Sequence, residues 1–463
     1  MYDPLNGKCV VVLGFARQGR ALARWLPTVG ARVVVSDSKS VEQLDLNPSD
    51  YPAVEFVLGG HPETLLEGAD LLCLSGGVPN DLPIVQVARR YGVPLTNDAQ
   101  LFLERCPAPV IGITGSAGKT TTTTLIGEIL KRAGYKTWVG GNIGDVLLHV
   151  LPIIQPTDRV VMELSSFQLE LMSVSPPIAA ITNITPNHLD RHGTMEEYIV
   201  AKSNLLRWQG GSDSAVLGWD DANTRMIGES GVFAGRVAWF SGRDMVTDGA
   251  FLAGERLLLV GDASYDGSPH VICERKDIQL RGDHNVLNVL AACAITGVAG
   301  VKPEVMAEVI REFRGVAHRL EIVRVKDGVT YINDSIATAP ERVVAALKSF
   351  DEPLVLLLGG KDKDLPWEQL IALALNKSRR IIAFGDTSKE KSAAEKVIKA
   401  VKGLTGRTDL VTVCPTLEVA VAEAAKVAQA GDVVLLSPGG TSYDAYVDFA
   451  ERGEHFRTLV NGL

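Results

Sequence analysis

The sequence predicts an α/β protein of three domains. Short apolar runs bounded by turn residues alternate with helical stretches along nearly all of its 463 residues. A chain of this length usually forms about three domains. We therefore expect a Rossmann-like parallel sheet over residues 1–106, a central α/β domain over 107–316 and a C-terminal Rossmann-like α/β domain over 317–463. Cys106-Pro107-Ala108-Pro109 has the composition of a linker.

Composition excludes several classes of protein. The apolar fraction of 46% and charged fraction of 22% predict large cores and argue against disorder. A net charge of −9 argues against nucleic-acid binding and against an anionic membrane surface. No apolar run reaches the roughly 18 residues of a spanning helix, and the N-terminus lacks a signal-peptide pattern. Six scattered cysteines without a Cys-x-x-Cys pair indicate reduced thiols, so we expect a cytoplasmic protein without membrane insertion.

The first domain is predicted from alternating strands and helices. Expected strands are Lys8–Leu13, Ala31–Ser36, Glu55–Leu58, Leu71–Ser75 and Pro94–Thr96, and expected helices are Arg17–Val29 and Leu82–Tyr91. The turn Gly14–Gly19 resembles a dinucleotide fingerprint, except that Ala16 replaces the glycine that lets the backbone approach a pyrophosphate. Two interpretations remain open here: a nucleotide diphosphate at the helix N-terminus with Asp37 and Ser38 near its base or ribose, or a purely structural turn.

The central domain opens with a phosphate-binding loop. An apolar run, Val110–Ile113, is followed by Thr114-Gly115-Ser116-Ala117-Gly118-Lys119-Thr120-Thr121 and then by an apolar-periodic helix. Glycines let backbone N–H groups surround phosphate oxygens, the lysine reaches the β- and γ-phosphates, and the threonine hydroxyl can ligate Mg²⁺. Ile113 stands where the strict motif has its first glycine. The strand–loop–helix context nevertheless favours a P-loop, hence an ATP-binding domain, over an ordinary turn.

Later strands continue the α/β pattern. In the central domain we expect them at Thr137–Gly140, Arg159–Leu164, Ile178–Ile184 and Ala215–Trp219, followed by shorter strands within 250–280 and a helix carrying Asn285 and Asn288. In the third domain we expect strands at Val329–Asn333, Leu354–Gly359, Ile381–Phe384, Leu410–Val413 and Asp432–Ser437, with helices at Pro340–Phe350 and Leu417–Ala430.

Polar residues follow several of these strands. Glu163 ends one strand in the P-loop domain, where a carboxylate either holds Mg²⁺ or is satisfied structurally. The loop 187–193 contains two histidines, an aspartate and an arginine, which favours function over a solvated surface. Tyr198 and Lys202 lie one helical turn apart, and therefore on one face. Arg319 either clamps a phosphate from the neighbouring domain or pairs with Glu321.

Together these motifs resemble the Mur ligase family, ATP-dependent amide-forming enzymes of peptidoglycan precursor synthesis. The resemblance spans almost the whole chain and rests on several ordered motifs: 114–121, Gly140-Gly141-Asn142-Ile143-Gly144, Glu163-Leu164-Ser165-Ser166-Phe167-Gln168, 187–193, Tyr198 to Lys202, His284-Asn285 with Asn288, His318-Arg319-Leu320-Glu321 and Asn333-Asp334-Ser335. The turn 14–19, the Asp37-Ser38 pair and the segment from Leu436 to Asp444 are most similar to the D-glutamate-adding members. Ile336 departs from the lysine that many of those members have.

The resemblance implies a set of site residues. ATP would contact Gly115, Ser116, Ala117, Gly118, Lys119, Thr120, Thr121, Asn285, Asn288, Arg319 and Asp334. One Mg²⁺ would be held by Thr120 and Glu163, and a second by His188 and Lys202, the lysine being carbamylated by CO₂. The catalytic set would be Lys119, His188, Lys202 and Arg319. The substrates would contact Phe15, Ala16, Asp37, Ser38, Gly76, Asn142, Thr338, Lys363, Ser442 and Phe449, with Lys361 an alternative to Lys363.

The reaction implied by the resemblance joins D-glutamate to UDP-N-acetylmuramoyl-L-alanine through an acyl phosphate. We also expect a monomer that closes about residues 315–320. Three alternatives remain: another amide ligase with a different acceptor (a second type of Mur ligase or a folylpolyglutamate synthetase-like enzyme), an NAD-binding regulator with an inactive P-loop, and a P-loop regulatory module without chemistry.

Overall fold

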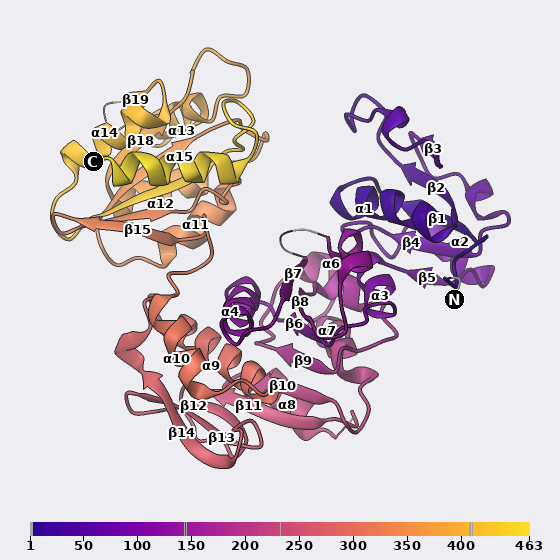
Figure 1. Cartoon of the computed structure of the whole chain (residues 1–463). Coiled ribbons are helices and arrows are strands. Elements are labelled where there is room, and N and C mark those ends of the chain that lie inside the picture. Colours follow the sequence, from indigo (N-terminus) through magenta and orange to yellow (C-terminus); the bar gives the residue numbers. More distant parts are fainter. Residues whose placement is uncertain (1–2, 143, 145, 232, 407–408, 410) are drawn as a thin grey trace. The chain divides into compact units, whose positions relative to one another are not determined.

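The computed structural model describes residues 3–142, 144, 146–231, 233–406, 409 and 411–463 (Figure 1). Ile143 of the glycine-rich motif and Leu410, the expected first residue of a strand, lie outside the described residues. The chain forms two compact units, Met1–Phe313 and Arg314–Leu463. The expected α/β architecture with parallel N-terminal and C-terminal sheets is confirmed, whereas the domain boundaries at 106 and 316 stay predictions.

The first sheet of unit 1 has five parallel strands in the order β3-β2-β1-β4-β5. The strands are β1 Cys9–Leu13, β2 Arg32–Asp37, β3 Val54–Leu58, β4 Leu71–Leu74 and β5 Leu95–Thr96, and the helices are α1 Arg17–Trp25, α2 Pro83–Arg90 and α3 Asp98–Leu103. All five strands were predicted to within one residue. The predicted helix Arg17–Val29 is wrong at its end, because Pro27 has no N–H and residues Leu26–Val29 form a 3-10 turn.

The second sheet of unit 1 has nine strands in the order β14-β13-β12-β11-β10-β9-β6-β8-β7. Its strands are β6 Val110–Thr114, β7 Thr137–Gly141, β8 Arg159–Glu163, β9 Ile178–Ile181, β10 Ser214–Gly218, β11 Arg236–Ser241, β12 Gly249–Ala253, β13 Arg256–Gly261 and β14 Gly267–Glu274. Neighbouring strands pair in parallel from β7 to β12, and β13 and β14 add an antiparallel edge. The sequence did not predict β11, and strand β9 ends three residues before the expected Ile184.

Helices cover both faces of this second sheet. They are α4 Lys119–Arg132, α5 Ser166–Leu169, α6 Leu189–His192, α7 Met195–Arg207, α8 Ala222–Glu229, α9 Asp283–Val298 and α10 Pro303–Glu312. Buried residues of α4, α9 and α10 form one cluster with the sheet. None of the helices in the described part of the chain is long and apolar enough to cross a membrane.

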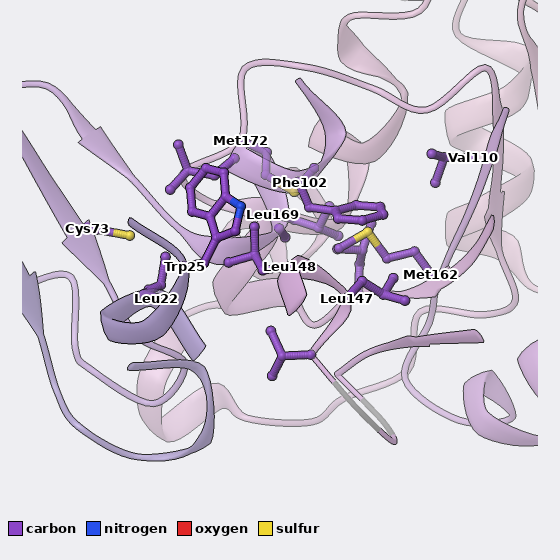
Figure 2. Packing of buried hydrophobic residues seen from close by; sticks show 14 of the residues in the cluster. Leu22, Trp25, Cys73, Phe102, Val110, Leu147, Leu148, Met162, Leu169 and Met172 are labelled. Carbon is purple, nitrogen blue, oxygen red and sulfur yellow. The ribbon is translucent and has the colours of Figure 1, made fainter. Parts of the chain in front are cut away.

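One buried cluster joins the two sheets of unit 1. Leu22 and Trp25 of α1 and Phe102 of α3 belong to the same apolar cluster as Leu148 and Met162, which come from beyond residue 107 (Figure 2). Apolar area removed from water is worth roughly 25 cal/mol per Å², so a continuous core couples the two sheets energetically. The region around β1 is therefore held against the region around β8.

Unit 2 contains a six-stranded sheet in the order β15-β16-β20-β17-β18-β19, with only β15 antiparallel to its neighbour. The elements are β15 Glu321–Lys326, β16 Val329–Asn333, α11 Pro340–Lys348, β17 Leu354–Gly359, α12 Glu368–Lys377, β18 Ser378–Phe384, α13 Ala393–Thr405, β19 Val411–Cys414, α14 Leu417–Val427, β20 Val433–Gly439 and α15 Phe449–Asn461. Separate apolar clusters lie on the two faces of the sheet. The predicted strands Val329–Asn333 and Leu354–Gly359 are confirmed at both ends.

Candidate functional site

The turn between β6 and α4 is built so that only glycine fits at two positions. Gly115 and Gly118 have φ angles of +154° and +82°. A Cβ at Gly115 would lie 1.9 Å from Thr182 Oγ1, and one at Gly118 would lie 2.1 Å from Asn288 Oδ1. The loop is therefore seated tightly against neighbouring polar side chains, with the N-terminus of the 14-residue helix α4 behind it.

Residues after β9 hold this loop in place. Thr182 Oγ1 donates to the carbonyl of Ala117 at 2.7 Å, and the N–H of Ala117 donates to Asn183 Oδ1 at 2.9 Å. Ser116 Oγ donates to the carbonyl of Thr185 at 2.9 Å. Thr182 and Asn183 were not singled out in the sequence. The available signal was their position just after a strand that pairs with β6, since the carboxyl ends of adjacent parallel strands meet.

Lys119, Thr120 and Glu163 come together at the start of α4. Lys119 Nζ donates to the carbonyl of Gly115 at 2.8 Å, so the ammonium folds back over the loop. Thr120 Oγ1 donates to Glu163 Oε2 at 2.9 Å, and Asn142 Nδ2 donates to Glu163 Oε1 at 3.0 Å. Glu163 ends β8 and is 1% exposed. A hydroxyl and a buried carboxylate beside a phosphate loop are oxygen donors of the kind that Mg²⁺ prefers.

Lys202 lies beneath the same loop. It extends from α7, is 1% exposed, and donates to the carbonyl of Gly115 at 3.0 Å and to Thr114 Oγ1 at 3.3 Å. Burial, together with the nearby charge of Lys119, lowers the pKa of Lys202 from 10.5 to about 7, and Glu163 opposes this shift. A substantial neutral fraction is therefore present near pH 7, and only a neutral amine can react as a nucleophile.

The two histidines of the loop 187–193 have different environments. His188 is exposed and has a φ of +54°, a left-handed conformation that is uncommon for non-glycine residues. His192 is buried, with Nε2 2.9 Å from Ser166 Oγ and Nδ1 2.8 Å from Glu170 Oε1. The sequence analysis grouped both histidines in one candidate functional loop and assigned a role, that of a Mg²⁺ ligand implied by the family resemblance, to His188. It did not predict that His192 is buried. The side chain of Asp190 lies outside the described part of the structure.

A cavity of about 330 Å³ opens beside the phosphate loop. Its lining residues are Ala117, Gly118, Thr182, Asn183, Thr185, Gly218, Asp220, Asp221, Phe240, Arg243, His284, Leu287 and Asn288. Of the expected pair, Asn288 lines the cavity, and its Nδ2 donates to Asn285 Oδ1 at 2.9 Å. Phe240 and Arg243 were missed because β11 was not predicted; Phe240 lies in that strand and Arg243 follows it. Asp220 directly follows the predicted strand Ala215–Trp219, so its position was a usable signal that was overlooked.

Expected contacts in the N-terminal sheet lie at the carboxyl ends of β1, β2 and β4. Asp37 accepts from the backbone N–H of Phe15 at 2.7 Å and of Lys39 at 2.9 Å. The Phe15 ring packs 5.2 Å from Tyr51 in the core, so its backbone is what the turn presents. The other expected residues here are an exposed Ala16, an exposed Ser38, and Gly76, where a Cβ would lie 2.9 Å from Gln18 Nε2.

Arg17, which the sequence interpretation did not select, connects this turn to the central sheet. Its Nη2 donates to the carbonyls of Asn142 at 2.9 Å and Gly141 at 3.2 Å. Asn142 in turn contacts Glu163, so a hydrogen-bonded path leads from the first turn of α1 to the carboxylate beside the phosphate loop. Only folding brings residues this distant in sequence together.

In unit 2, Asp334 follows β16 and is 4% exposed. Its Oδ2 accepts from Ser437 Oγ at 2.7 Å and its Oδ1 accepts from the N–H of Leu320 at 3.2 Å. Burial raises the pKa of Asp334 to about 6, and the nearby Arg319 opposes that rise. The structure thus brings the expected residues Arg319 and Asp334 into one electrostatic neighbourhood.

The remaining expected residues of unit 2 follow the three neighbouring strands β16, β20 and β17. Lys363 Nζ donates to Thr338 Oγ1 at 3.4 Å, whereas Lys361 pairs through its backbone with Thr441. Ser442 is buried, and Phe449 begins α15. These residues share one edge of the sheet, where α/β proteins usually bind ligands.

Arg452 was not anticipated. It is completely buried, and its guanidinium donates to Ser335 Oγ at 3.0 Å, to the carbonyl of Ser335 at 2.9 Å and to the carbonyl of Gly440 at 3.2 Å. Burial lowers the pKa of Arg452 to about 10. It ties the end of β16 to the segment after β20, and thereby shapes the edge that carries Thr338 and Ser442.

Three successive parts of the chain match known domain families. Residues 8–97 match the MurD-like N-terminal domain of Mur ligases, 113–296 the Mur ligase middle domain and 318–440 the glutamate ligase domain of Mur ligases. The UDP-N-acetylmuramoylalanine–D-glutamate ligase of Symbiobacterium thermophilum is 42% identical over 457 residues, which cover 98% of this chain and 97% of that protein. The chain belongs to the Mur ligase family. The expected resemblance is thereby confirmed.

Other Mur ligases agree with this assignment. A Clostridium botulinum protein, also named UDP-N-acetylmuramoylalanine–D-glutamate ligase, is 40% identical over 465 residues, covering 100% of this chain and 98% of that protein. Among solved structures, UDP-N-acetylmuramate–alanine ligase from Thermotoga maritima has a TM-score of 0.54 at 20% identity and covers 98% of this chain and 99% of its own. A 2,6-diaminopimelate-adding ligase has a TM-score of 0.55 at 19% identity, and the match covers 99% of this chain and 92% of that chain. The two structures support the Mur ligase fold alone.

Proposed function

We propose that this Mur ligase uses ATP to join D-glutamate to UDP-N-acetylmuramoyl-L-alanine, releasing ADP and phosphate. The observation that carries the chemistry is the cluster at the phosphate loop, where Lys119 and Lys202 both donate to the carbonyl of Gly115 and Thr120 donates to Glu163. The choice of substrates is supported by the names of the two relatives that match along nearly their whole length.

ATP is proposed to bind with its phosphates on the loop from Gly115 to Thr121. The backbone N–H groups and the N-terminus of α4 favour negative charge there, and Lys119 already lies across the loop. The cavity lined by Asn288, Phe240 and His284 is next to that loop and is a suitable size for a base and ribose. Asn285 supports Asn288.

The residues present fit a first Mg²⁺ at Thr120 and Glu163, whose oxygens are neighbours. No group of three or more His, Cys, Asp or Glu side chains suited to a metal occurs among the described residues, so phosphate oxygens and water would complete the coordination. A second Mg²⁺ is proposed at His188 and a carbamate on Lys202. The carbamate would replace an ammonium, which repels Mg²⁺, with anionic oxygens. Bound Mg²⁺ would neutralise charge on the phosphoryl oxygens.

The reaction we propose has two steps. The L-alanyl carboxylate attacks the γ-phosphorus of ATP, forming an acyl phosphate as ADP leaves, because a carboxylate alone is a poor acyl donor. The amine of D-glutamate then attacks the acyl carbon, a tetrahedral intermediate forms, the amine loses its proton and phosphate leaves. Lys119 and Arg319 are proposed to stabilise charge on the transferred group. Since Arg319 and Asp334 belong to unit 2, closure about residues 315–320 is part of the proposal.

Substrate contacts are proposed at residues of all three sheet regions. The backbone of Phe15 and Ala16, with Asp37, Ser38 and Gly76, would hold the UDP group, and Asn142 and His188 would face the muramoyl-alanine end. Thr338, Lys363, Ser442 and Phe449 would hold D-glutamate, whose side-chain carboxylate needs a cation. The contact of Lys363 with Thr338 supports Lys363 over Lys361.

A panel of amino acids tests the proposal. The purified chain is given ATP, Mg²⁺ and UDP-N-acetylmuramoyl-L-alanine with D-glutamate, L-glutamate, L-alanine or diaminopimelate, and both phosphate release and product mass are measured. We expect product only with D-glutamate. Turnover only with another amino acid would refute the assignment. A cytoplasmic location is also proposed, supported by six unpaired cysteines, and sizing chromatography will check the expected monomer.

A further inference from the structure

His192 occupies the centre of a row of rings that connects the two residues proposed for the second Mg²⁺. The Phe167 ring stacks on His192 with centroids 5.1 Å apart and planes 4° from parallel, and it packs edge-to-face with His188 at a centroid distance of 5.4 Å. On the other side His192 packs against Tyr198 at 5.0 Å. Lys202 Nζ lies 4.7 Å from the centre of the Tyr198 ring.

Both ring nitrogens of His192 are engaged, which fixes its orientation. Nε2 is 2.9 Å from Ser166 Oγ and Nδ1 is 2.8 Å from Glu170 Oε1. Glu170 itself accepts a hydrogen bond from Asn80, which belongs to the N-terminal sheet region of unit 1. A buried ring held at both nitrogens cannot rotate without leaving a buried polar group unpaired, which is energetically unfavourable.

The row also reaches the phosphate loop directly. Tyr198 OH lies 3.1 Å from Ser116 Oγ, and Ser116 belongs to the loop that is proposed to hold ATP. His192 therefore sets the position of Tyr198 relative to the loop, and of Phe167 relative to His188. His192 and Tyr198 are both buried, so the packing leaves little freedom for either ring.

We propose that His192 is a positioning residue that holds His188 and Lys202 at the separation needed to share one Mg²⁺. It acts through Phe167 on one side and through Tyr198 on the other, and it touches neither substrate nor metal. This inference rests on the proposed function. Mutation of a residue that supports a metal ligand commonly lowers metal affinity or activity by about 10–100-fold.

The test compares the His192→Ala variant with the wild-type chain in three measurements. Mn²⁺ affinity is measured by electron paramagnetic resonance with a non-hydrolysable ATP analogue, carbamate at Lys202 by ¹³C NMR with labelled bicarbonate, and kcat and KM by phosphate release. We expect at least about tenfold weaker binding of the weaker Mn²⁺ ion, less carbamate and a lower kcat, with the KM for ATP changed less than about twofold.

Three further variants separate positioning from mere stability. Ser166→Ala and Glu170→Gln keep the ring and remove or neutralise one partner, and we expect smaller effects in the same direction. His270→Ala is the matched control, because His270 also pairs with a carboxylate, Asp266 at 2.8 Å, and stacks on Tyr265 at 4.8 Å, away from the loop. We expect this control to leave Mn²⁺ affinity and kcat unchanged.

The possible outcomes separate this inference from the proposed function. Wild-type Mn²⁺ affinity and wild-type carbamate in His192→Ala, Ser166→Ala and Glu170→Gln, in a chain that still ligates D-glutamate, would overturn the role of His192. Should His192→Ala fail to fold, the same readouts from Ser166→Ala and Glu170→Gln decide. A wild-type chain that makes no product with any amino acid would instead contradict the proposed function.

Discussion

The hydroxyl of Thr120 donates a 2.9 Å hydrogen bond to the carboxylate of Glu163, although 43 residues separate the two in sequence. Parallel pairing of β6 with β8 creates this relationship, because it aligns Ile113 with Glu163 and so places the end of β8 beside the loop that follows β6. Several consequences of the site geometry can be measured.

Replacing Glu163 with Gln keeps the shape of the side chain and removes its charge. We expect kcat to fall by at least about 100-fold and the Mg²⁺ requirement to rise, because a neutral amide is a weaker ligand. Steady-state kinetics across a Mg²⁺ titration will measure both. Asp158→Asn is the control, because Asp158 immediately precedes β8 and accepts a hydrogen bond from Trp138 Nε1 at 2.8 Å. Loss of turnover in the control but not in Glu163→Gln would contradict the prediction.

The buried amine of Lys202 makes stability depend on pH. The pKa of Lys202 is about 7 in the folded chain, whereas the ordinary value is 10.5. Between pH 7 and pH 10.5 the unfolded chain therefore keeps the proton on Lys202 that the folded chain has lost. Stability therefore rises with pH from about 7 to 10.5. Lys202→Met should abolish turnover and stabilise the CO₂-free protein at pH 7 by as much as about 4 kcal/mol. Denaturant unfolding at pH 7 and 10 will measure this, with exposed Lys131→Met as control.

Replacing Gly118 with Ala tests whether the phosphate loop has room for a side chain at this position. Alanine at this position would place its Cβ 2.1 Å from Asn288 Oδ1, in addition to the strain of a φ of +82°. We expect ATP affinity to fall at least about tenfold as the loop moves, together with a stability loss of about 1–3 kcal/mol. Gly134→Ala separates the two effects, because Gly134 has a φ of +92° but no atom within 4 Å of the added Cβ. Calorimetric titration with ATP should therefore show normal affinity in that control.

Lys363 and Lys361 give a paired test of the amino-acid site. If Lys363 binds the side-chain carboxylate of D-glutamate, Lys363→Ala should raise the KM for D-glutamate at least about tenfold and leave the KM for ATP almost unchanged. Lys361→Ala should have little effect, because the segment around Lys361 is held through backbone bonds to Thr441. Steady-state kinetics at varied D-glutamate concentration will measure the KM of both variants. A raised KM in Lys361→Ala but not in Lys363→Ala would assign the contact to Lys361.

Arg452 is expected to matter for stability. Its removal takes the guanidinium donors away from the carbonyls of Ser335 and Gly440, and a buried group left without its hydrogen-bond partner typically costs about 1–3 kcal/mol. Arg452→Met should therefore lower the midpoint of denaturant unfolding of the full chain. Exposed Arg207→Met is the control, and equal midpoints for the two variants would contradict this role.

Local chemistry made some of the site predictable. Gly115, Gly118, Lys119 and Thr120 follow one another in the chain, so the loop was recognisable without knowing what packs on it. Glu163 was recognisable as the last residue of a buried strand. Arg243 and Arg452 gave no comparable signal, since each works only through neighbours brought close by folding.

The sequence by itself determined the strand–loop–helix units, the order of the motifs and the family, because these depend on neighbours in the chain and on apolar periodicity. Only the tertiary structure decided which of the two loop histidines is buried, that Lys202 lies against the carbonyl of Gly115, and that Arg17 reaches Asn142. The physical reason is that burial, a shifted pKa and a hydrogen bond all depend on which segments pack together, and parallel strand order sets that packing through space rather than along the chain.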